Sequence, residues 1–125
     1  MNSLYIEKTA LTPLVIFDKE SSFLKLEGRM IPEDVEGTFS PINTWIENYF
    51  ETNQKLHLLF RLYYYNTSSA RQFFLMFKKL DAHFAKGKNV FIRWEYEEGD
   101  EDSMSDAGEF LSGVHFSHEI VPVTG

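Results

Sequence analysis

Three consecutive hydroxyl side chains, Thr67, Ser68 and Ser69, are the residues of this chain best placed to carry a chemical modification. They follow Asn66, at the point where an apolar run typical of a strand ends and an amphipathic helix begins. The first turn of a helix has free backbone N–H groups and the positive end of the helix dipole. Such a position can accept a phosphate. Ser, Thr and Asn are also ordinary N-cap residues, so the simpler interpretation of this segment on its own is a plain helix cap.

A phosphate on Thr67 or Ser68 would add about 1.5 to 2 negative charges at neutral pH. Near a helix N-terminus this charge is tolerated or mildly favourable, and Arg71, one turn further on, can pair with it. We therefore expect the phosphate to leave the fold intact. Its effect would fall on a partner that docks over this surface, through repulsion and desolvation.

The sequence offers no catalytic constellation. It has no glycine-rich phosphate loop, no G-x-S-x-G motif and no H-E-x-x-H motif. It has no cysteine, and its four histidines are scattered. His115 and His118 would point to opposite faces of a strand, so they do not suggest a metal site. We therefore expect a protein that is not an enzyme, with no catalytic residues, no bound metal and no cofactor.

Acidic residues are concentrated in one segment. The formal net charge is −7, and residues 95–109 contain eight acids and no Lys or Arg, which leaves the rest of the chain at +1. A calcium loop starting at Asp100 would need Gly and Glu where the chain has Ser105 and Leu111. Nucleic-acid binding would need a basic stripe. The segment therefore indicates a solvated acidic loop, or a docking patch for a basic partner surface.

The elements that position these residues follow from hydrophobic periodicity. The pattern predicts one domain over residues 1–125, with strands at 14–17, 23–26, 56–65, 89–96 and 116–123 and helices at 41–51, 71–86 and 104–111. The order predicts an α/β fold with a mixed sheet of about five strands and helices packed on it.

Three details of this assignment concern single elements. Ser40 is the expected N-cap of the first helix, with Pro41 at its first position. The apolar run 56–65 predicts a central strand covered on both faces. The helix over 71–86 is expected to bury a stripe of Phe73, Phe77, Leu80 and Phe84, widened by Phe74 and Met76. No signal peptide and no run of about 20 apolar residues is visible, so a cytoplasmic location is expected.

Several short motifs, in their order and spacing, resemble those of one protein family. They are Thr-Pro-Leu-Val-Ile-Phe-Asp at 12–18, Gly28-Arg29 with Pro32-Glu33, Trp-Ile-Glu at 45–47, Tyr-Tyr-Asn-Thr-Ser-Ser at 64–69, and Arg-Trp-Glu-Tyr at 93–96 before the acidic segment. Over nearly its whole length the chain resembles the SiaC family of bacterial regulatory phosphoproteins. Their fold is related to that of the STAS (SpoIIAA-like) anti-anti-sigma factors.

This resemblance implies a phosphorylation switch at Thr67, with Ser68 and Ser69 as secondary candidates. It implies a SiaB-like Ser/Thr kinase, a SiaA-like PP2C-type phosphatase and a SiaD-like diguanylate cyclase as partners, and no nucleic acid or membrane. The unphosphorylated protein would activate the cyclase, raise cyclic di-GMP and control biofilm formation. The residues expected at the partner surface are Asn66, Thr67, Ser68, Arg71, Pro32, Glu33 and Asp34. The family often has Pro-Glu-Asn where this chain has Pro32-Glu33-Asp34.

Two other functions remain open from the residues alone. A domain that binds an apolar small molecule in its aromatic core predicts a sizeable internal pocket. A structural homodimer predicts an exposed apolar patch.

Overall fold

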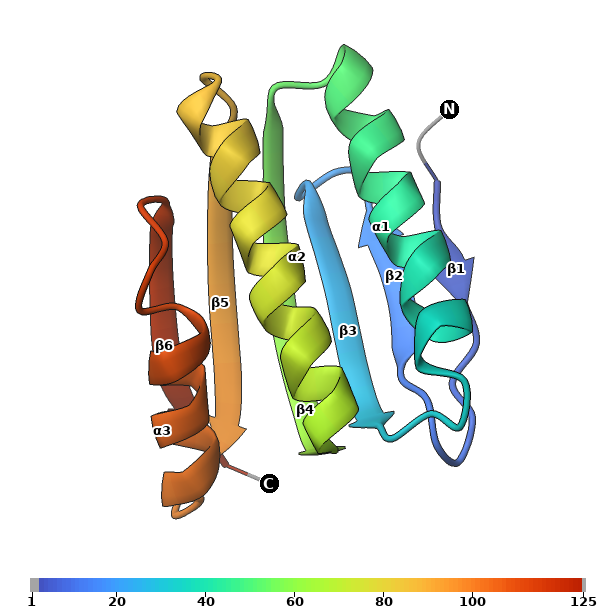
Figure 1. Cartoon of the computed structure of the whole chain (residues 1–125), viewed down its shortest axis with the longest axis vertical. Helices are drawn as coiled ribbons and strands as arrows, with labels where there is room; N and C mark the ends of the chain where they lie inside the picture. Colours follow the sequence, from blue (N-terminus) through green and yellow to red (C-terminus); the bar gives the residue numbers. More distant parts are fainter. Residues whose placement is uncertain (1–2, 125) are drawn as a thin grey trace.

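A computed structural model describes residues 3–124, which form one six-stranded mixed sheet with three α-helices (Figure 1). The order of strands in the sheet is the order along the chain. The elements are β1 (Tyr5–Ile6), β2 (Leu14–Asp18), β3 (Phe23–Met30), α1 (Val35–Thr52), β4 (Lys55–Tyr65), α2 (Thr67–Ala85), β5 (Asn89–Glu97), α3 (Glu101–Phe110) and β6 (Ser117–Val123). The predicted α/β fold is confirmed. The sheet has six strands and not about five, because the two-residue strand β1 pairs with β2.

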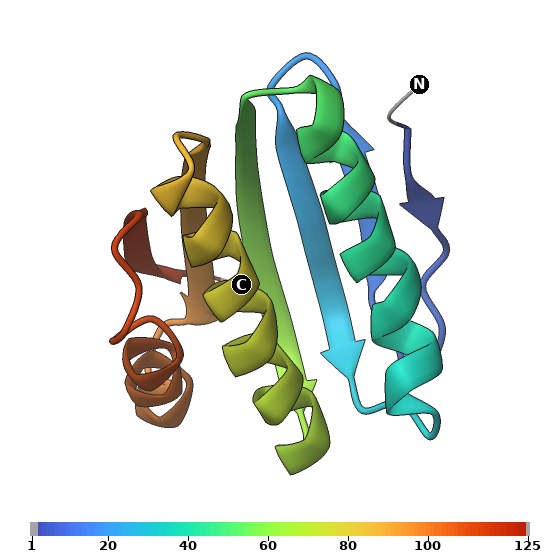
Figure 2. The ribbon, with the colours of Figure 1, turned by 45° about the horizontal axis from the view of Figure 1, so that its top comes forward.

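All three described helices lie on the same face of the sheet (Figures 1 and 2). β1, β2 and β3 pair in antiparallel fashion, whereas β3, β4, β5 and β6 pair in parallel through the crossovers α1, α2 and α3. When successive β-α-β crossovers have the same handedness and each adds its strand at the same edge of the sheet, their helices lie on the same face of the sheet. The prediction that β4 is covered on both faces is therefore wrong. Its residues alternate between buried and half-buried, and only the buried set faces the helices.

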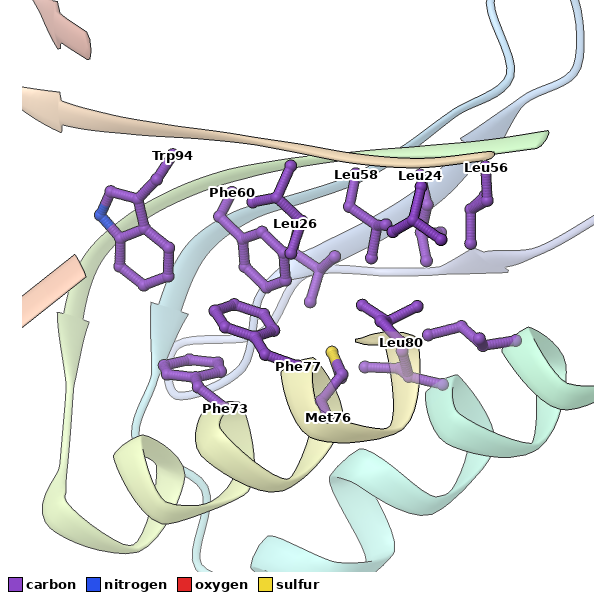
Figure 3. Packing of buried hydrophobic residues seen from close by; sticks show 14 of the residues in the cluster. Leu24, Leu26, Leu56, Leu58, Phe60, Phe73, Met76, Phe77, Leu80 and Trp94 are labelled. Atoms are coloured by element: carbon purple, nitrogen blue, oxygen red, sulfur yellow. The ribbon is translucent and has the colours of Figure 1, made fainter. Parts of the chain in front are cut away.

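The core lies between the sheet and the helices. Figure 3 shows large apolar side chains of the strands pointing towards those of α2, among them Phe60 and Trp94 opposite Phe73 and Phe77. Phe60 and Trp94 stack with ring centroids 5.4 Å apart, and Phe73 meets Trp94 edge to face at 5.7 Å. Such aromatic pairs add to the free energy gained by burial. This cluster fixes the position of α2 on the sheet.

The predicted buried stripe of α2 needs two corrections. Phe73, Met76, Phe77 and Leu80 are buried, whereas Phe74 and Phe84 are 45% and 38% exposed. A helix turns only one stripe of its surface to a sheet. The four buried residues fill that stripe, so Phe74 is turned away from the sheet, and Phe84 lies in the last turn of the helix.

The first helix begins earlier than predicted. Its N-cap is Asp34, whose Oδ1 accepts a hydrogen bond from the amide of Gly37 at 3.0 Å. Pro41, expected at the first helical position, lies inside α1 with an exposed side chain. The Ser40–Pro41 start is therefore wrong, because the carboxylate of Asp34 supplies an earlier cap.

The helix predicted at 104–111 is present but begins earlier, within the acidic residues that were interpreted as a loop. Helix α3 begins at Glu101, and Oδ1 of its N-cap Asp100 accepts from the amide of Ser103 at 3.1 Å. Glu101 and Asp102 lie in the first turn, where the helix dipole favours negative charge. These acidic residues therefore stabilise the start of a helix instead of keeping the segment in a loop.

The sheet face without helices, here called the open face, carries a ladder of ion pairs from β3 to β6. Adjacent members approach to between 2.6 and 4.0 Å, in the order Lys25, Glu27, Arg61, Glu95, Arg93 and Glu119. The hydrogen bond from Lys25 lowers the pKa of Glu27, although burial opposes this change. The ladder lets charged side chains occupy a half-buried sheet face because opposite charges alternate across the strands.

Candidate functional site

The candidate residues gather at the carboxyl edge of the sheet, which we define as the segments that follow β3, β4 and β5. Met30 pairs with Tyr65 in the parallel register of β3 and β4, so residues 32–34 and 66–68 leave the sheet from adjacent strand ends. β5 runs parallel beside β4 and leads into α3. The three described helices therefore all begin at this edge (Figure 1). The structure brings the two predicted partner-binding segments together.

Asn66 is the residue that caps α2. Its side-chain oxygen accepts a hydrogen bond from the amide of Ser69 at 2.9 Å, and its carbonyl accepts from the amide of Ala70. The helix thus begins at Thr67 and not at Arg71. Because an amide side chain provides the cap, the hydroxyls of the first turn are not needed for it.

The three hydroxyls differ in accessibility. Thr67 and Ser68 are exposed, and within residues 3–124 neither side chain makes a hydrogen bond. Ser69 is fully buried, and its Oγ has no partner in the same part of the chain. An enzyme can therefore reach Thr67 and Ser68 on the folded protein, whereas Ser69 would become accessible only if the first turn opened.

The N-terminus of α2 carries no negative charge, unlike those of the other described helices. α1 has Asp34 as its cap and Glu36 in its first turn. α3 has Asp100 as its cap, followed by two more acids. α2 has the neutral Asn66 and no acid in its first turn. Its positive dipole end is therefore uncompensated at the position of Thr67.

Arg71 and the loop of residues 32–34 complete the set of predicted residues. Arg71 is exposed and lies four residues after Thr67, hence on the same side of α2. Pro32 is buried, Glu33 is exposed, and the carboxylate of Asp34 is engaged in capping α1. Of this loop, Glu33 is thus the charged side chain that is open to a partner.

Helix α3 is attached directly beside the start of α2, a connection that the sequence analysis did not foresee. The Tyr65 hydroxyl donates to Oδ2 of Asp106 at 2.8 Å, and the Trp94 indole N–H donates to Ser103 Oγ at 3.4 Å. Burial, and then the hydrogen bond to Asp106, raise the pKa of Tyr65 well above its usual value. The helix was predicted at 104–111, and Asp100 as an N-cap three residues before Ser103 was the signal that could have placed its start at Glu101.

A surface groove of about 490 Å³ lies between α2 and the segment formed by α3 and the turn after it. Phe74 and Leu75 line it from α2, and Phe110 and Val114 line it from the other side. Charged side chains at its rim are Lys78, Asp81 and Glu109. Assignment of Phe74 to the core hid this groove from the sequence analysis.

Residues 3–124 contain neither a membrane-spanning helix nor a cluster of metal ligands. No helix there is long and apolar enough to cross a membrane. In the same range, no group of three or more His, Cys, Asp or Glu side chains could hold a metal ion.

Comparison with known proteins identifies the family. The model of the SiaC family of regulatory phosphoproteins matches residues 6–123. An uncharacterised protein of Pseudomonas aeruginosa (strain UCBPP-PA14) is 30% identical over 121 residues, which are 96% of each chain. The crystal structure of apo-SiaC from Pseudomonas aeruginosa superposes with a TM-score of 0.87 at 29% identity, covering 96% of this chain and 98% of that one.

A second solved structure contains a partner. It is the diguanylate cyclase SiaD in complex with its activator SiaC from Pseudomonas aeruginosa. The match has a TM-score of 0.88 and 30% identity and covers 94% of this chain and 97% of that one. The family match and these likenesses extend over almost the whole chain. This chain therefore belongs to the SiaC family of regulatory phosphoproteins.

Proposed function

We propose that this protein is a single-domain, non-enzymatic signalling protein of the cytoplasm whose binding to a diguanylate cyclase is switched by reversible phosphorylation of Thr67. A SiaB-like kinase adds the phosphate, and a SiaA-like PP2C-type phosphatase removes it. Membership of a family of regulatory phosphoproteins supports this proposal. So does the likeness to SiaC, which forms a complex with the cyclase SiaD as its activator.

The observation that carries the proposal is that the Thr67 hydroxyl is accessible at the start of α2. Its hydroxyl is exposed and unbonded within residues 3–124, and it lies in the first turn of α2, where no acidic side chain offsets the helix dipole. A phosphate there meets free backbone N–H groups. Arg71, one turn along the helix, is close enough in sequence to pair with it.

The switch acts on the partner and leaves the fold unchanged. Asn66 caps α2 through its own side chain, so Thr67 can be modified without loss of the cap. The phosphate adds a charge of about −1.5 to −2 at a position where unmodified Thr67 has a neutral hydroxyl. A cyclase docked over Asn66, Thr67, Ser68 and Arg71, with the neighbouring loop of residues 32–34, is then repelled.

Phosphate mapping tests the site. The protein is incubated with the SiaB-like kinase of the same organism, and the modified residue is located by mass spectrometry, with Thr67→Ala and Ser68→Ala as matched variants. We expect Thr67→Ala to abolish incorporation and Ser68→Ala to retain it. Incorporation that survives in Thr67→Ala would show that Thr67 is not the switch.

Calorimetric titration tests the consequence. The unmodified protein should bind the organism's SiaD-like cyclase and raise its activity, and both effects should be lost on phosphorylation and weakened in Thr67→Asp. The thermal midpoint of Thr67→Asp should remain close to that of the wild type. A large loss of stability in this variant would instead identify Thr67 as a structural residue of the helix start.

A further inference from the structure

The open face of the sheet carries apolar side chains although none of the described helices covers it (Figures 1 and 2). An aromatic row crosses this face, in which Phe23, His57 and Phe91 are register neighbours on β3, β4 and β5. The ring centroids of successive members are 5.2 and 5.3 Å apart. Leu59 lies beside the row, two residues after His57 on β4. A sheet face that bears apolar side chains and has no second layer is a surface that a partner can cover.

The ion-pair ladder makes this face electrically neutral, whereas the chain as a whole is acidic. The ladder contains three basic and three acidic side chains, and the formal net charge of the chain is −7. Helix α3, on the other side of the sheet, has four acids and no Lys or Arg. Two copies of an acidic protein repel each other over most of their surfaces. The open face is therefore where a second copy can approach with the least repulsion.

The charges of the ladder are complementary to the same ladder in reverse order. Basic and acidic side chains alternate from Lys25 at one end to Glu119 at the other. A two-fold axis parallel to the strands, between β4 and β5, places β3 opposite β6 and β4 opposite β5 of a second copy. Lys25 and Glu119 share one row of register partners, so each faces the other across this axis. In the adjacent row, Arg61 faces Glu95 of the second copy.

Two members of the ladder can make further contacts. Its end members are its most exposed side chains, with Lys25 at 37% and Glu119 at 43%. Near its centre, the guanidinium of Arg61 approaches Glu27 and Glu95 only to 4.0 and 3.8 Å. Within residues 3–124 its Nε is buried and has no hydrogen-bond partner. A buried donor without an acceptor lowers stability, so a carboxylate that faces this guanidinium across an interface is a favourable addition.

We propose that the open face binds a second copy of this chain, and that the two sheets pack face to face around the two-fold axis between β4 and β5. His57 of one copy then lies opposite Phe91 of the other, so the aromatic rows cover each other, and the charged rows pair with opposite sign. Two sheets that pack with their strands nearly aligned bury their inner faces as in a β-sandwich. A two-fold contact of this kind is closed, and it gives a dimer and not a filament.

The size of the open face makes this dimer a reversible one. The face spans four interstrand distances of about 4.8 Å from β2 to β6, and about 20 Å along residues 57–63 of β4. This area is small for a permanent dimer, so we expect a dissociation constant in the micromolar range. The helices remain on the two outer sides of the dimer, and Thr67 remains exposed in each copy. Dimer formation is therefore independent of the phosphorylation proposed above.

Charge reversal at the two ends of the ladder tests the dimer by sedimentation velocity of the full-length chain over the micromolar range. Lys25→Glu and Glu119→Lys each place like charges opposite one another in a dimer of identical copies, so each should raise the dissociation constant at least about tenfold. An equimolar mixture of the two variants should form dimers like the wild type, because each new charge then faces its opposite. Lys25 and Glu119 are on β3 and β6, separated by two strands, so recovery on mixing arises only between copies.

Lys79→Glu is the matched control, with the same change of charge at an exposed position of α2 on the other side of the sheet. It should dimerise like the wild type, and the thermal midpoints of all variants verify that they are folded. A photoreactive side chain at position 59 should cross-link two copies through β5. A monomeric wild type, a dimer that both open-face variants retain, a mixture that stays monomeric or cross-links to a helix would each overturn the inference. None of these outcomes affects the proposed function, which phosphate mapping tests separately.

Discussion

The hydroxyl of Tyr65 donates a hydrogen bond of 2.8 Å to Oδ2 of Asp106, across 41 positions of sequence. Tyr65 is the last residue of β4, two residues before Thr67, and Asp106 is in the middle of α3. The ring of Tyr65 also meets Phe73 and Phe110 edge to face, at 5.8 and 5.9 Å. The start of α2 and the acidic helix are therefore held together by one side chain.

Removal of this hydroxyl should loosen α3. Tyr65→Phe keeps the ring contacts but leaves the Asp106 carboxylate without its donor, so we expect the free energy of unfolding to fall by about 1–2 kcal/mol. Amide hydrogen exchange in α3 should accelerate more than in α1. Tyr64→Phe is the control, since Tyr64 is 61% exposed and its hydroxyl makes no hydrogen bond within residues 3–124. Identical stability of the two variants would mean that the Tyr65–Asp106 bond contributes nothing.

The cap of α2 and the proposed phosphorylation site should be separable by mutation. Asn66→Ala removes the acceptor for the Ser69 amide and should cost about 1 kcal/mol of stability. Thr67→Ala removes an exposed hydroxyl that is not bonded within the described chain and should change stability by less than about 0.5 kcal/mol. Urea unfolding of both variants measures the difference. A larger loss for Thr67→Ala than for Asn66→Ala would contradict the assignment of the cap.

The open face should make stability depend on pH through His57. Its ring lies between Phe23 and Phe91, with centroids 5.2 and 5.3 Å away. Burial, and then the charge of Lys55, lower its pKa. A group whose pKa is lower in the folded state binds a proton more readily when unfolded. The stabilisation from neutral His57 is therefore complete above about pH 6.5, its unfolded pKa, and is lost as the pH falls through the folded value.

Urea unfolding at pH 7.5 and 5.5 checks this dependence. The wild type should lose stability between these two values, and His57→Gln should lose less, because glutamine does not titrate. The difference between the two slopes isolates His57 from carboxylates that titrate at lower pH. Parallel slopes would show that His57 does not contribute to the pH dependence.

The sequence predicted the elements whose signals are local. The alternation in residues 89–96, the Asn66–Ser69 junction and the helix after it are all set by neighbouring residues, and the α/β order followed from them. The sequence also revealed the resemblance to a phosphoprotein family, because the motifs of that family are short and occur in a defined order. It is confirmed by the family match over residues 6–123.

The features that were missed depend on contacts between distant parts of the chain. Strand β1 was missed because a strand of two residues shows no periodicity, and it is recognised only by its pairing with β2. The exposure of Phe74 follows from the way α2 is turned on the sheet, which buries Phe73, Phe77 and Leu80 instead. The start of α3 was hidden by acids that looked like a solvated loop. That all helices share one face is a property of topology, and the long apolar run of β4 could not reveal it.

The agreement between strand order and chain order has a consequence for how the molecule is made. Each strand joins the edge of the sheet that already exists, and none is inserted between two earlier ones. A chain leaving the ribosome can therefore fold by adding one unit after another in the order of synthesis. In this order α3 and β6 follow the other elements, and α3 supplies Glu109 and Phe110 to the lining of the groove. The groove between α2 and α3 is thus complete only after synthesis has passed Val114.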